Sequence, residues 1–240
     1  MRENKLTLCR LGLILALCLW CIHAAKAQST LANAPSTDVV AEKKVYLEFD
    51  FVSNYAHHYN SGFQSYAPRA VVGIGHNVEA GANVVYTDGF GSSQPIEIQP
   101  NFKWRFFTNE RKKLAASLGC ILYVPITHRT GTDTFGLCYT LFSKKLNGTY
   151  GPRFTGGGYA LVNRRDGNGA KAGAVAGYEQ PLAGRVSFVM DWFSGQNRFG
   201  YVTPGFSFTT SQRSTLYTGY SIGNHGRRNN AFFTFYGITF

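Results

Sequence analysis

The sequence predicts an all-β protein, an antiparallel transmembrane β-barrel of about 12 strands, with roughly 10–14 as the range. Three observations support this fold class. The chain is poor in charge and rich in aromatic residues, it begins with a secretion signal, and most of the remainder alternates apolar and polar residues with a period of two.

Composition excludes several classes of protein. Charged residues make up 15% of the 240 residues, against about 25% in ordinary soluble domains, whereas aromatic residues also reach 15%. So many aromatic side chains exclude an intrinsically disordered chain. A mean hydropathy of -0.14 excludes a protein of several membrane-spanning helices. The one long apolar run, residues 11–22, is shorter than the about 20 residues that a spanning helix needs.

Residues 1–27 have the three parts of a secretory signal peptide. Residues 2–10 carry three basic side chains, residues 11–22 are apolar, and residues 25–27 read Ala-Lys-Ala, a small-residue cleavage site. The alternative, an N-terminal membrane anchor, is disfavoured by the shortness of the apolar run. Removal of this segment, which holds four basic residues and one acid, lowers the formal net charge from +11 to +8.

The remaining chain divides into a polar lead, residues 28–44, expected in the periplasm, and the barrel, residues 45–240. The clearest alternation covers residues 96–106, where six apolar residues occupy one face and five polar residues the other. Similar runs cover 47–51, 70–74, 78–86, 172–178, 186–192, 202–208 and 216–222. Weaker runs cover 114–126, 135–143, 153–162 and 230–240. Turn-forming residues separate these runs, as expected of strands joined by hairpins.

A soluble β-sandwich or a lipocalin-like barrel, with the apolar face inward, is the alternative fold. Two observations favour a membrane barrel. The polar face carries opposite charges on neighbouring strands, and aromatic residues gather near the strand ends, where a membrane barrel meets the lipid–water interfaces. These aromatic residues are Tyr86, Trp104, Phe106, Phe107, Tyr178, Trp192, Tyr201, Phe208 and Tyr236.

The final strand carries a resemblance. Residues 231–240 end the chain on Phe240, with Ile238 and Tyr236 on the same face. This resembles the C-terminal insertion signal of Gram-negative outer membrane proteins. The stretch from residues 191–195 through residues 220–224 also resembles the final strands of bacterial outer membrane barrels. The resemblance implies the cell outer membrane as location and the barrel-assembly machinery as a partner that recognises Phe240.

The inward-facing residues of the predicted strands are charged but nearly balanced. Six acids and five bases are expected to line the lumen: Glu48, Asp50, Glu79, Glu97, Glu179 and Asp191 with Arg69, Lys103, Arg105, Lys171 and Arg185. Each charge can pair with its neighbour, which closes the lumen with salt bridges, or line a narrow pore. The sequence leaves both interpretations open.

The predicted outer rim is basic. The predicted outer loops contain six arginines and three aspartates: Arg129, Arg164, Arg165, Arg198, Arg227 and Arg228, with Asp88, Asp133 and Asp166. These arginines can steer anionic solutes or bind lipopolysaccharide phosphates. Among the outer loops, the sequence predicts that only the first, residues 53–65, is long enough to fold back as a constriction.

The predicted function is a narrow passive channel for small hydrophilic solutes. The alternatives are a non-conducting structural or surface-interaction barrel and a lipid-modifying enzyme with a His–Ser or His–acid site at the rim. Residues of those types are His57, His58, His128, His225, Ser53, Ser61 and Asp133. No motif of such an enzyme is present, so no catalytic residue, metal ligand or cofactor is predicted. The expected partners are outer membrane lipids, lipopolysaccharide and small solutes, and not nucleic acid.

Cys120 and Cys138 lie at equal distances from position 129, the middle of a predicted hairpin connection. Cysteines that face each other across a hairpin can form a disulfide bond in the periplasm. However, poor alternation around Cys138 predicts a one-residue bulge that would separate them. The sequence therefore leaves the disulfide open.

Overall fold

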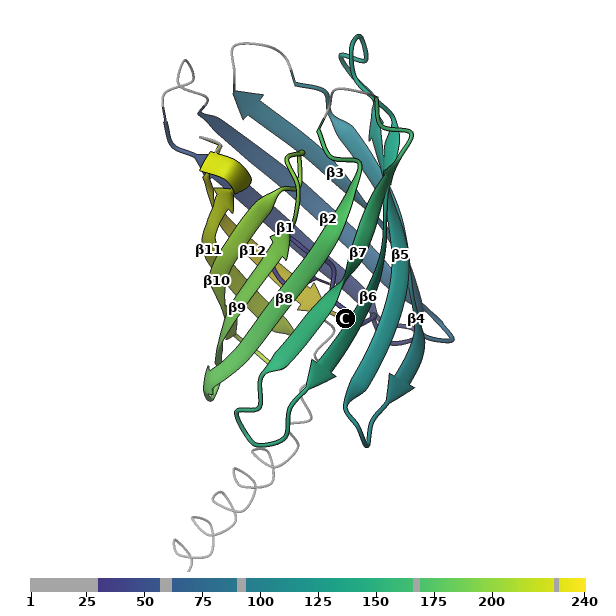
Figure 1. The fold of residues 1–240 in the computed structure, drawn as a ribbon, viewed down its shortest axis with the longest axis vertical. Coiled ribbons are helices and arrows are strands. Elements are labelled where there is room, and N and C mark those ends of the chain that lie inside the picture. Colours follow the sequence, from purple (N-terminus) through teal and green to yellow (C-terminus); the bar gives the residue numbers. More distant parts are fainter. Residues whose placement is uncertain (1–29, 57–61, 90–93, 166–168, 227–228) are drawn as a thin grey trace, which may run out of the picture.

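The computed structural model describes residues 30–56, 62–89, 94–165, 169–226 and 229–240. Over these residues, twelve antiparallel strands form a closed barrel in which each strand pairs with its sequence neighbours and β1 pairs with β12 (Figure 1). The strands are β1 Val45–Asn54, β2 Phe63–Gly75, β3 Val78–Gly89, β4 Glu97–Asn109, β5 Leu114–Pro125, β6 Phe135–Lys145, β7 Arg153–Val162, β8 Ala172–Ala183, β9 Val186–Phe193, β10 Tyr201–Thr209, β11 Ser214–Gly223 and β12 Ala231–Thr239. The predicted fold class is confirmed. No helix in the described ranges is long and apolar enough to cross a membrane.

The last residue of the chain completes the barrel. Val45 and Phe240 exchange two backbone hydrogen bonds, of 3.3 Å from the Val45 amide and 2.8 Å from the Phe240 amide. The remaining residues of β1 and β12 continue this antiparallel register up to Ser53. Tyr236 and Phe240 are exposed on the outer wall, and Ile238 is half-buried.

The outer wall is apolar, as the alternation predicts. Leu47, Phe49 and Ile74 expose 44%, 49% and 61% of their surface. On the same strands Glu48 and Val71 point inward and are buried. Closing the sheet removes every unpaired strand edge, which is the condition for placing β-structure in hydrocarbon.

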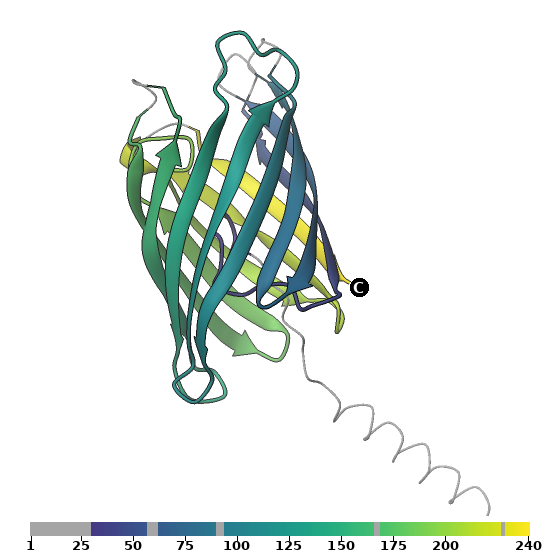
Figure 2. The same cartoon turned by 90° about the vertical axis from the view of Figure 1, so that its right-hand side faces the viewer.

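The two ends of the barrel differ (Figures 1 and 2). At one end, called the turn end, β1 begins, β12 ends, and connections such as residues 76–77 and 184–185 are tight hairpins. At the other end, called the loop end, longer connections such as residues 126–134, 163–171 and 194–200 join the strands.

The N-terminal lead lies inside the barrel. The sequence places residues 28–44 in the periplasm, but the described part, residues 30–44 (the N-terminal segment below), runs along the inner wall from the turn end (Figure 2). Leu31, Ala34 and Val40 are buried there. The segment is irregular and lacks the alternation of a strand, so the sequence does not indicate that it lies in the lumen.

Cys120 and Cys138 face each other directly across β5 and β6 and form a disulfide bond. The predicted bulge is wrong. Leu137 and Tyr139 on either side of Cys138 point inward and are buried, so both faces of β6 are apolar. Alternation is poor there because the inner wall is apolar, and not because the register shifts.

Candidate functional site

The inner wall of the barrel consists of two contrasting surfaces. The charged wall is the inner face of β1 to β4, with Glu48, Asp50, Arg69, Glu79, Asn83, Glu97, Gln99, Asn101 and Lys103. The apolar wall is the cluster of apolar side chains on the inner face of β5 to β9, a face that also carries Arg153, Glu179 and Asp191. Its members are Ile121, Tyr123, Phe135, Leu137, Tyr139, Leu141, Tyr159, Leu161, Val175 and Phe193. The N-terminal segment and a cavity lie between these walls.

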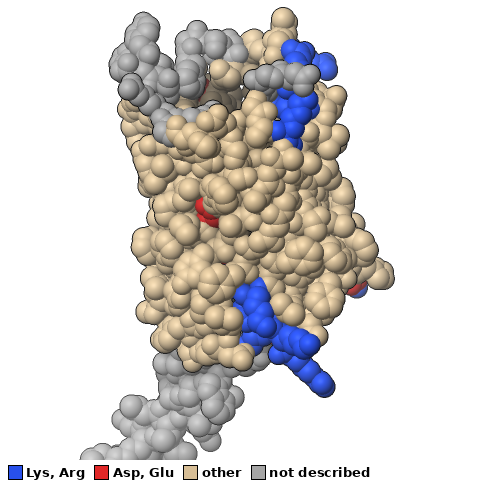
Figure 3. Space-filling view, in the orientation of Figure 1, with Lys and Arg blue, Asp and Glu red and all other residues tan. Residues whose placement is uncertain are grey.

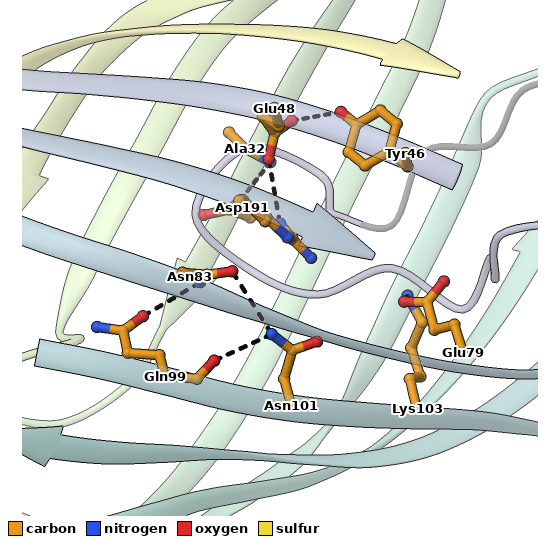
Figure 4. A network of polar contacts seen from close by, with 10 residues as sticks. Ala32, Tyr46, Glu48, Glu79, Asn83, Gln99, Asn101, Lys103 and Asp191 are labelled. Atoms are coloured by element: carbon orange, nitrogen blue, oxygen red, sulfur yellow. Dashed lines mark hydrogen bonds and ion pairs between the residues drawn. The ribbon is translucent and has the colours of Figure 1, made fainter. Parts of the chain in front are cut away.

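Glu48 is the centre of one charged group. Its Oε1 lies 3.1 Å from Nη1 of Arg69 on the next strand. The hydroxyl of Tyr46 donates a hydrogen bond to Oε2 of the same carboxylate (Figure 4). Asp50 follows on the same inward face of β1, and its Oδ1 is buried without a hydrogen-bond partner among the described residues.

Glu79 and Lys103 form a second, more deeply buried pair. Glu79 Oε1 lies 3.0 Å from Lys103 Nζ, and both side chains are 2% exposed. The other oxygen, Oε2, accepts a 2.6 Å hydrogen bond from the backbone amide of Val40 in the N-terminal segment. A buried ion pair requires such additional hydrogen bonds to offset its loss of hydration. The N-terminal segment therefore completes the charged wall.

Amide side chains continue the charged wall toward the loop end. Asn83 donates to Gln99 Oε1 over 3.1 Å, and Asn101 donates to Asn83 Oδ1 over 3.5 Å (Figure 4). Gln99 in turn donates to Glu97 over 3.1 Å. Each of these groups keeps further hydrogen-bonding capacity, so this surface can also bind water or polar solutes.

The apolar wall is built around aromatic contacts. The rings of Tyr123 and Phe135 stack at 4.7 Å between centroids, and Tyr159 meets Phe193 edge to face at 5.2 Å. Phe199 adds a third ring, 5.3 Å from Tyr123. Such pairs are the preferred geometries of aromatic contact.

Asp191 fixes the tip of the N-terminal segment. Its Oδ2 accepts hydrogen bonds of 2.9, 2.7 and 2.8 Å from the backbone amides of Ala32, Asn33 and Ala34. Next to this tip, Leu31 occupies the space that a side chain at Gly177 would take, since a Cβ there would lie 2.3 Å from Leu31 Cδ1. The carboxylate thus serves as the acceptor for three consecutive backbone amides, of which those of Ala32 and Ala34 are buried.

Nearer the turn end, further contacts bind the N-terminal segment to the barrel. Asp38 forms an ion pair with Arg153, which also binds Glu179 with two of its nitrogens. Thr37 shares a 2.6 Å hydrogen bond with Ser143. The segment is therefore bound to β3, β6, β7 and β9 by polar groups as well as by burial.

The connection of residues 194–200 crosses the loop end of the lumen. Arg198 donates two hydrogen bonds, of 2.7 and 2.6 Å, to the carboxylate of Glu97 on β4, and its guanidinium lies 4.9 Å from the Tyr123 ring centroid. Asn197 is buried and donates to Tyr159 and Ala170. The sequence predicts that only the first loop is long enough to fold back over the lumen, but this shorter connection crosses it.

A cavity remains between the two walls. It offers about 190 Å³ to the centres of water-sized molecules. Residues 30–35 border it at the turn side and Phe199 at the loop side, with Asp50, Arg69 and Asn101 on one wall and Tyr123 and Tyr139 on the other. The cavity therefore presents charge and amide groups opposite aromatic rings.

Eight of the residues predicted to line the lumen lie on the inner face of the barrel: Glu48, Asp50, Arg69, Glu79, Glu97, Lys103, Glu179 and Asp191. Arg105 is different, because its guanidinium binds Asn77 in the β2–β3 turn over 2.8 Å. Lys171 and Arg185 are exposed at the loop end and the turn end. Lys171 lies just before β8 and Arg185 just before β9, each an even number of residues from the inward-facing positions of that strand. The alternation therefore predicts that they face inward, although each lies outside the strand.

The predicted rim arginines have different environments. Arg129 is exposed. Arg164 stacks on Phe135 at 4.5 Å, and Arg165 Nε lies 2.7 Å from Asp133, which also pairs with Arg164. Arg227 and Arg228 lie outside the described residues. Asp133 is shared by Arg164 and Arg165, and Arg198 pairs with Glu97, an acid that the sequence assigned to the lumen; the excess of positive charge at the mouth is therefore smaller than the sequence suggests.

The residues considered for an enzyme site are dispersed where they are described. His128 and His225 are exposed in different connections, and Ser53 donates to the Phe63 carbonyl. His57, His58 and Ser61 lie outside the described residues. No group of three metal-ligating side chains occurs in the described ranges.

Sequence reasoning missed three features of the lumen. Arg153 begins a weakly alternating strand, so its pairing with Glu179 was not anticipated. Asp38 lies in the irregular N-terminal segment, and Asn197 in a loop. Only for Arg153 was a signal available, since it shares the inward phase of Thr155 and Tyr159.

No family model and no curated protein matches the chain. Similar solved structures include an outer membrane channel from Pseudomonas putida F1, with 13% identity, a TM-score of 0.46, and coverage of 82% of this chain and 94% of that one. A second, from work on the in-meso crystallization of membrane proteins, has 11% identity, a TM-score of 0.48, and coverage of 82% and 83%.

Proposed function

We propose that the protein is an outer membrane channel through which small hydrophilic solutes pass by diffusion. The observation that carries this proposal is the lumen cavity, lined on one side by charged and amide groups, inside a closed barrel with an apolar outer wall.

The dimensions of the lumen favour small solutes. The N-terminal segment borders the cavity on the turn side, and Phe199, from the connection of residues 194–200, borders it on the loop side. On the charged wall, Arg69 faces Glu48 and Lys103 faces Glu79, so the charges largely cancel. Size is therefore expected to select solutes more strongly than the sign of their charge.

The same features support the proposed location. A signal peptide over residues 1–27 would direct the chain across the inner membrane, and the exposed apolar wall requires a lipid environment. Phe240 on the final strand would serve as the recognition residue for the barrel-assembly machinery. Exposed basic residues at the loop end, such as Arg129, would contact lipopolysaccharide phosphates.

Swelling of proteoliposomes in solutes of increasing size tests the channel. The mature protein is expected to admit the smallest solutes and to exclude larger ones. Arg198→Ala removes the link between residues 194–200 and Glu97, so it should raise the swelling rate several-fold. Arg129→Ala, which removes an exposed arginine from the same end, is the matched control and should leave the rate unchanged.

A non-conducting barrel is the second candidate, and the binding of the N-terminal segment by Asp191 favours it. If neither the mature protein nor Arg198→Ala causes swelling in any solute, the channel proposal is overturned and this second function takes its place.

A further inference from the structure

The outer wall carries an apolar hollow at the turn end, where β4, β5 and β6 meet. It offers about 350 Å³ to the centres of water-sized molecules and is bordered by Phe106, Phe107, Leu114, Ala116 and Phe142. Phe106, Phe107 and Phe142 expose 41%, 45% and 59% of their surface. A hollow between exposed rings on a lipid-facing wall is a place where an acyl chain can lie.

A register irregularity creates this hollow. Trp104 pairs with Leu118, but Phe107 pairs with Ala116, so β4 has one more residue than β5 between the two pairs. The extra residue allows the consecutive rings of Phe106 and Phe107 both to be exposed on the outer wall. Opposite them Ala116 is small and only 1% exposed, so it lies beneath the neighbouring side chains as the floor of the hollow.

Basic residues lie directly beside the hollow. The β4–β5 turn contains Arg111, Lys112 and Lys113, and β6 ends in Lys144 and Lys145. The two groups are adjacent, since the Lys145 amide donates to the Lys113 carbonyl over 3.0 Å and Lys144 pairs with Leu114. We call these five residues the basic cluster.

The basic cluster is exposed and poorly neutralised. All five residues are exposed, and in the described ranges no ion pair involves Arg111, Lys112, Lys113 or Lys144. Glu110 is the one acid in the same turn. Figure 3 shows Lys and Arg gathered at the lower end of this face, below a surface that is almost free of charged residues.

We propose that this corner of the barrel binds an anionic phospholipid. One acyl chain lies in the hollow between Phe107 and Phe142, and the phosphate is bound by Lys112 and Lys144. The inference rests on the proposed membrane location and not on conduction. Clustered basic residues at the membrane surface favour anionic lipids over neutral ones.

The placement of the hollow decides between possible occupants. An acidic protein would bind the basic cluster only. It would leave the apolar hollow unoccupied, because the hollow faces lipid. Since loop-end residues such as Arg129 are proposed to contact lipopolysaccharide, the turn end faces the periplasm. The adjoining leaflet therefore supplies phospholipid and not lipopolysaccharide. Both parts of the surface are used when one molecule supplies an acyl chain and a phosphate.

Native mass spectrometry of the detergent-purified mature protein tests the proposal, with phosphatidylglycerol and phosphatidylcholine offered at equal concentration. The protein should retain several-fold more phosphatidylglycerol. Lys112→Gln/Lys144→Gln should abolish the preference. Arg185→Gln/Arg213→Gln removes two exposed charges from other turns of the same end and should leave it intact. Ala116→Leu, which fills the hollow without changing charge, should lower retention of both lipids.

Equal retention of the two lipids by the mature protein would overturn the proposal. So would an equal loss of preference in both double variants, because the effect would then reflect net charge and not this corner. Preferential retention of lipid A over phosphatidylglycerol would overturn the assignment of the leaflet. Heat-modifiable migration in gels verifies that each variant is folded. Since lipid retention does not depend on solute passage, a failed swelling assay would leave this result interpretable.

Discussion

The charged wall and the apolar wall of the lumen belong to the same barrel, but different forces hold them. On β1 to β4, buried side chains such as Glu79 and Lys103 are stabilised by pairing and by hydrogen bonds. On β5 to β9, side chains such as Leu137 and Phe193 are stabilised by removal from water. The N-terminal segment contacts both walls, since Val40 binds Glu79 and Leu31 packs among the apolar residues.

The difference between the two walls explains why some strands show clear alternation in the sequence and others do not. Alternation is a contrast between two faces, so it is strong where the inner face is polar, as in residues 96–106. It fades on β6, where Leu137, Tyr139 and Leu141 point inward and Phe142 points to the outer wall. On β6, the weak pattern therefore reflects an apolar inner face.

The largest effect on stability is expected from the charged wall. Lys103→Ala leaves the Glu79 carboxylate buried without its cation, which should lower the free energy of unfolding by about 3–5 kcal/mol. Urea unfolding in lipid vesicles, followed by tryptophan fluorescence, measures this. The double variant Lys103→Met/Glu79→Gln removes both charges and should recover most of the loss. A loss below about 1 kcal/mol in the single variant would contradict the importance of pairing on this wall.

A somewhat smaller effect is expected from the apolar wall. Leu137→Ala creates a cavity in the buried cluster and should cost about 3 kcal/mol, whereas Leu137→Met, which conserves volume, should cost less than about 1.5 kcal/mol. The same unfolding assay compares them. If both variants cost the same, the cluster is not closely packed, and the contrast between the two walls fails.

The contact between the N-terminal segment and β9 should contribute less. Asp191→Ala leaves the amides of Ala32, Asn33 and Ala34 without their acceptor, at a cost of about 2 kcal/mol. Because the barrel strands do not depend on this carboxylate, the segment should be released locally while the barrel remains folded. Limited proteolysis should then cleave within residues 30–44 in the variant but not in the parent protein. Equal protection of the segment in both proteins would show that Asp191 does not hold it.

The smallest effect on stability is expected for charged residues that lie just outside the strands. Lys171→Ala and Arg185→Ala remove exposed charges outside both walls, so each should change the free energy of unfolding by no more than about 0.5 kcal/mol. Substitution of Arg69, by contrast, breaks its pair with Glu48. A large loss in Lys171→Ala would place that side chain in the lumen after all.

Much of the fold could be predicted because it is repetitive. Strand alternation and turn residues recur along the chain, and they indicated both the barrel and its approximate strand number. The interior could only partly be predicted. Glu79 and Lys103 followed from strand phase, but Val40 reaches them from a segment without period, and Arg198 reaches Glu97 across the barrel from a loop. Such contacts join residues far apart in sequence, and no local pattern reports them.

Single-channel conductance in planar bilayers tests the central claim, that the N-terminal segment fills part of a lumen that otherwise conducts. The measurement compares the mature protein with a variant lacking residues 30–41, in which β1 is intact. The account predicts discrete conductance steps that are several-fold larger in the deletion variant, with the folded barrel retained in heat-modifiable migration. Equal or smaller steps in a folded deletion variant, or no steps in either protein, would contradict it.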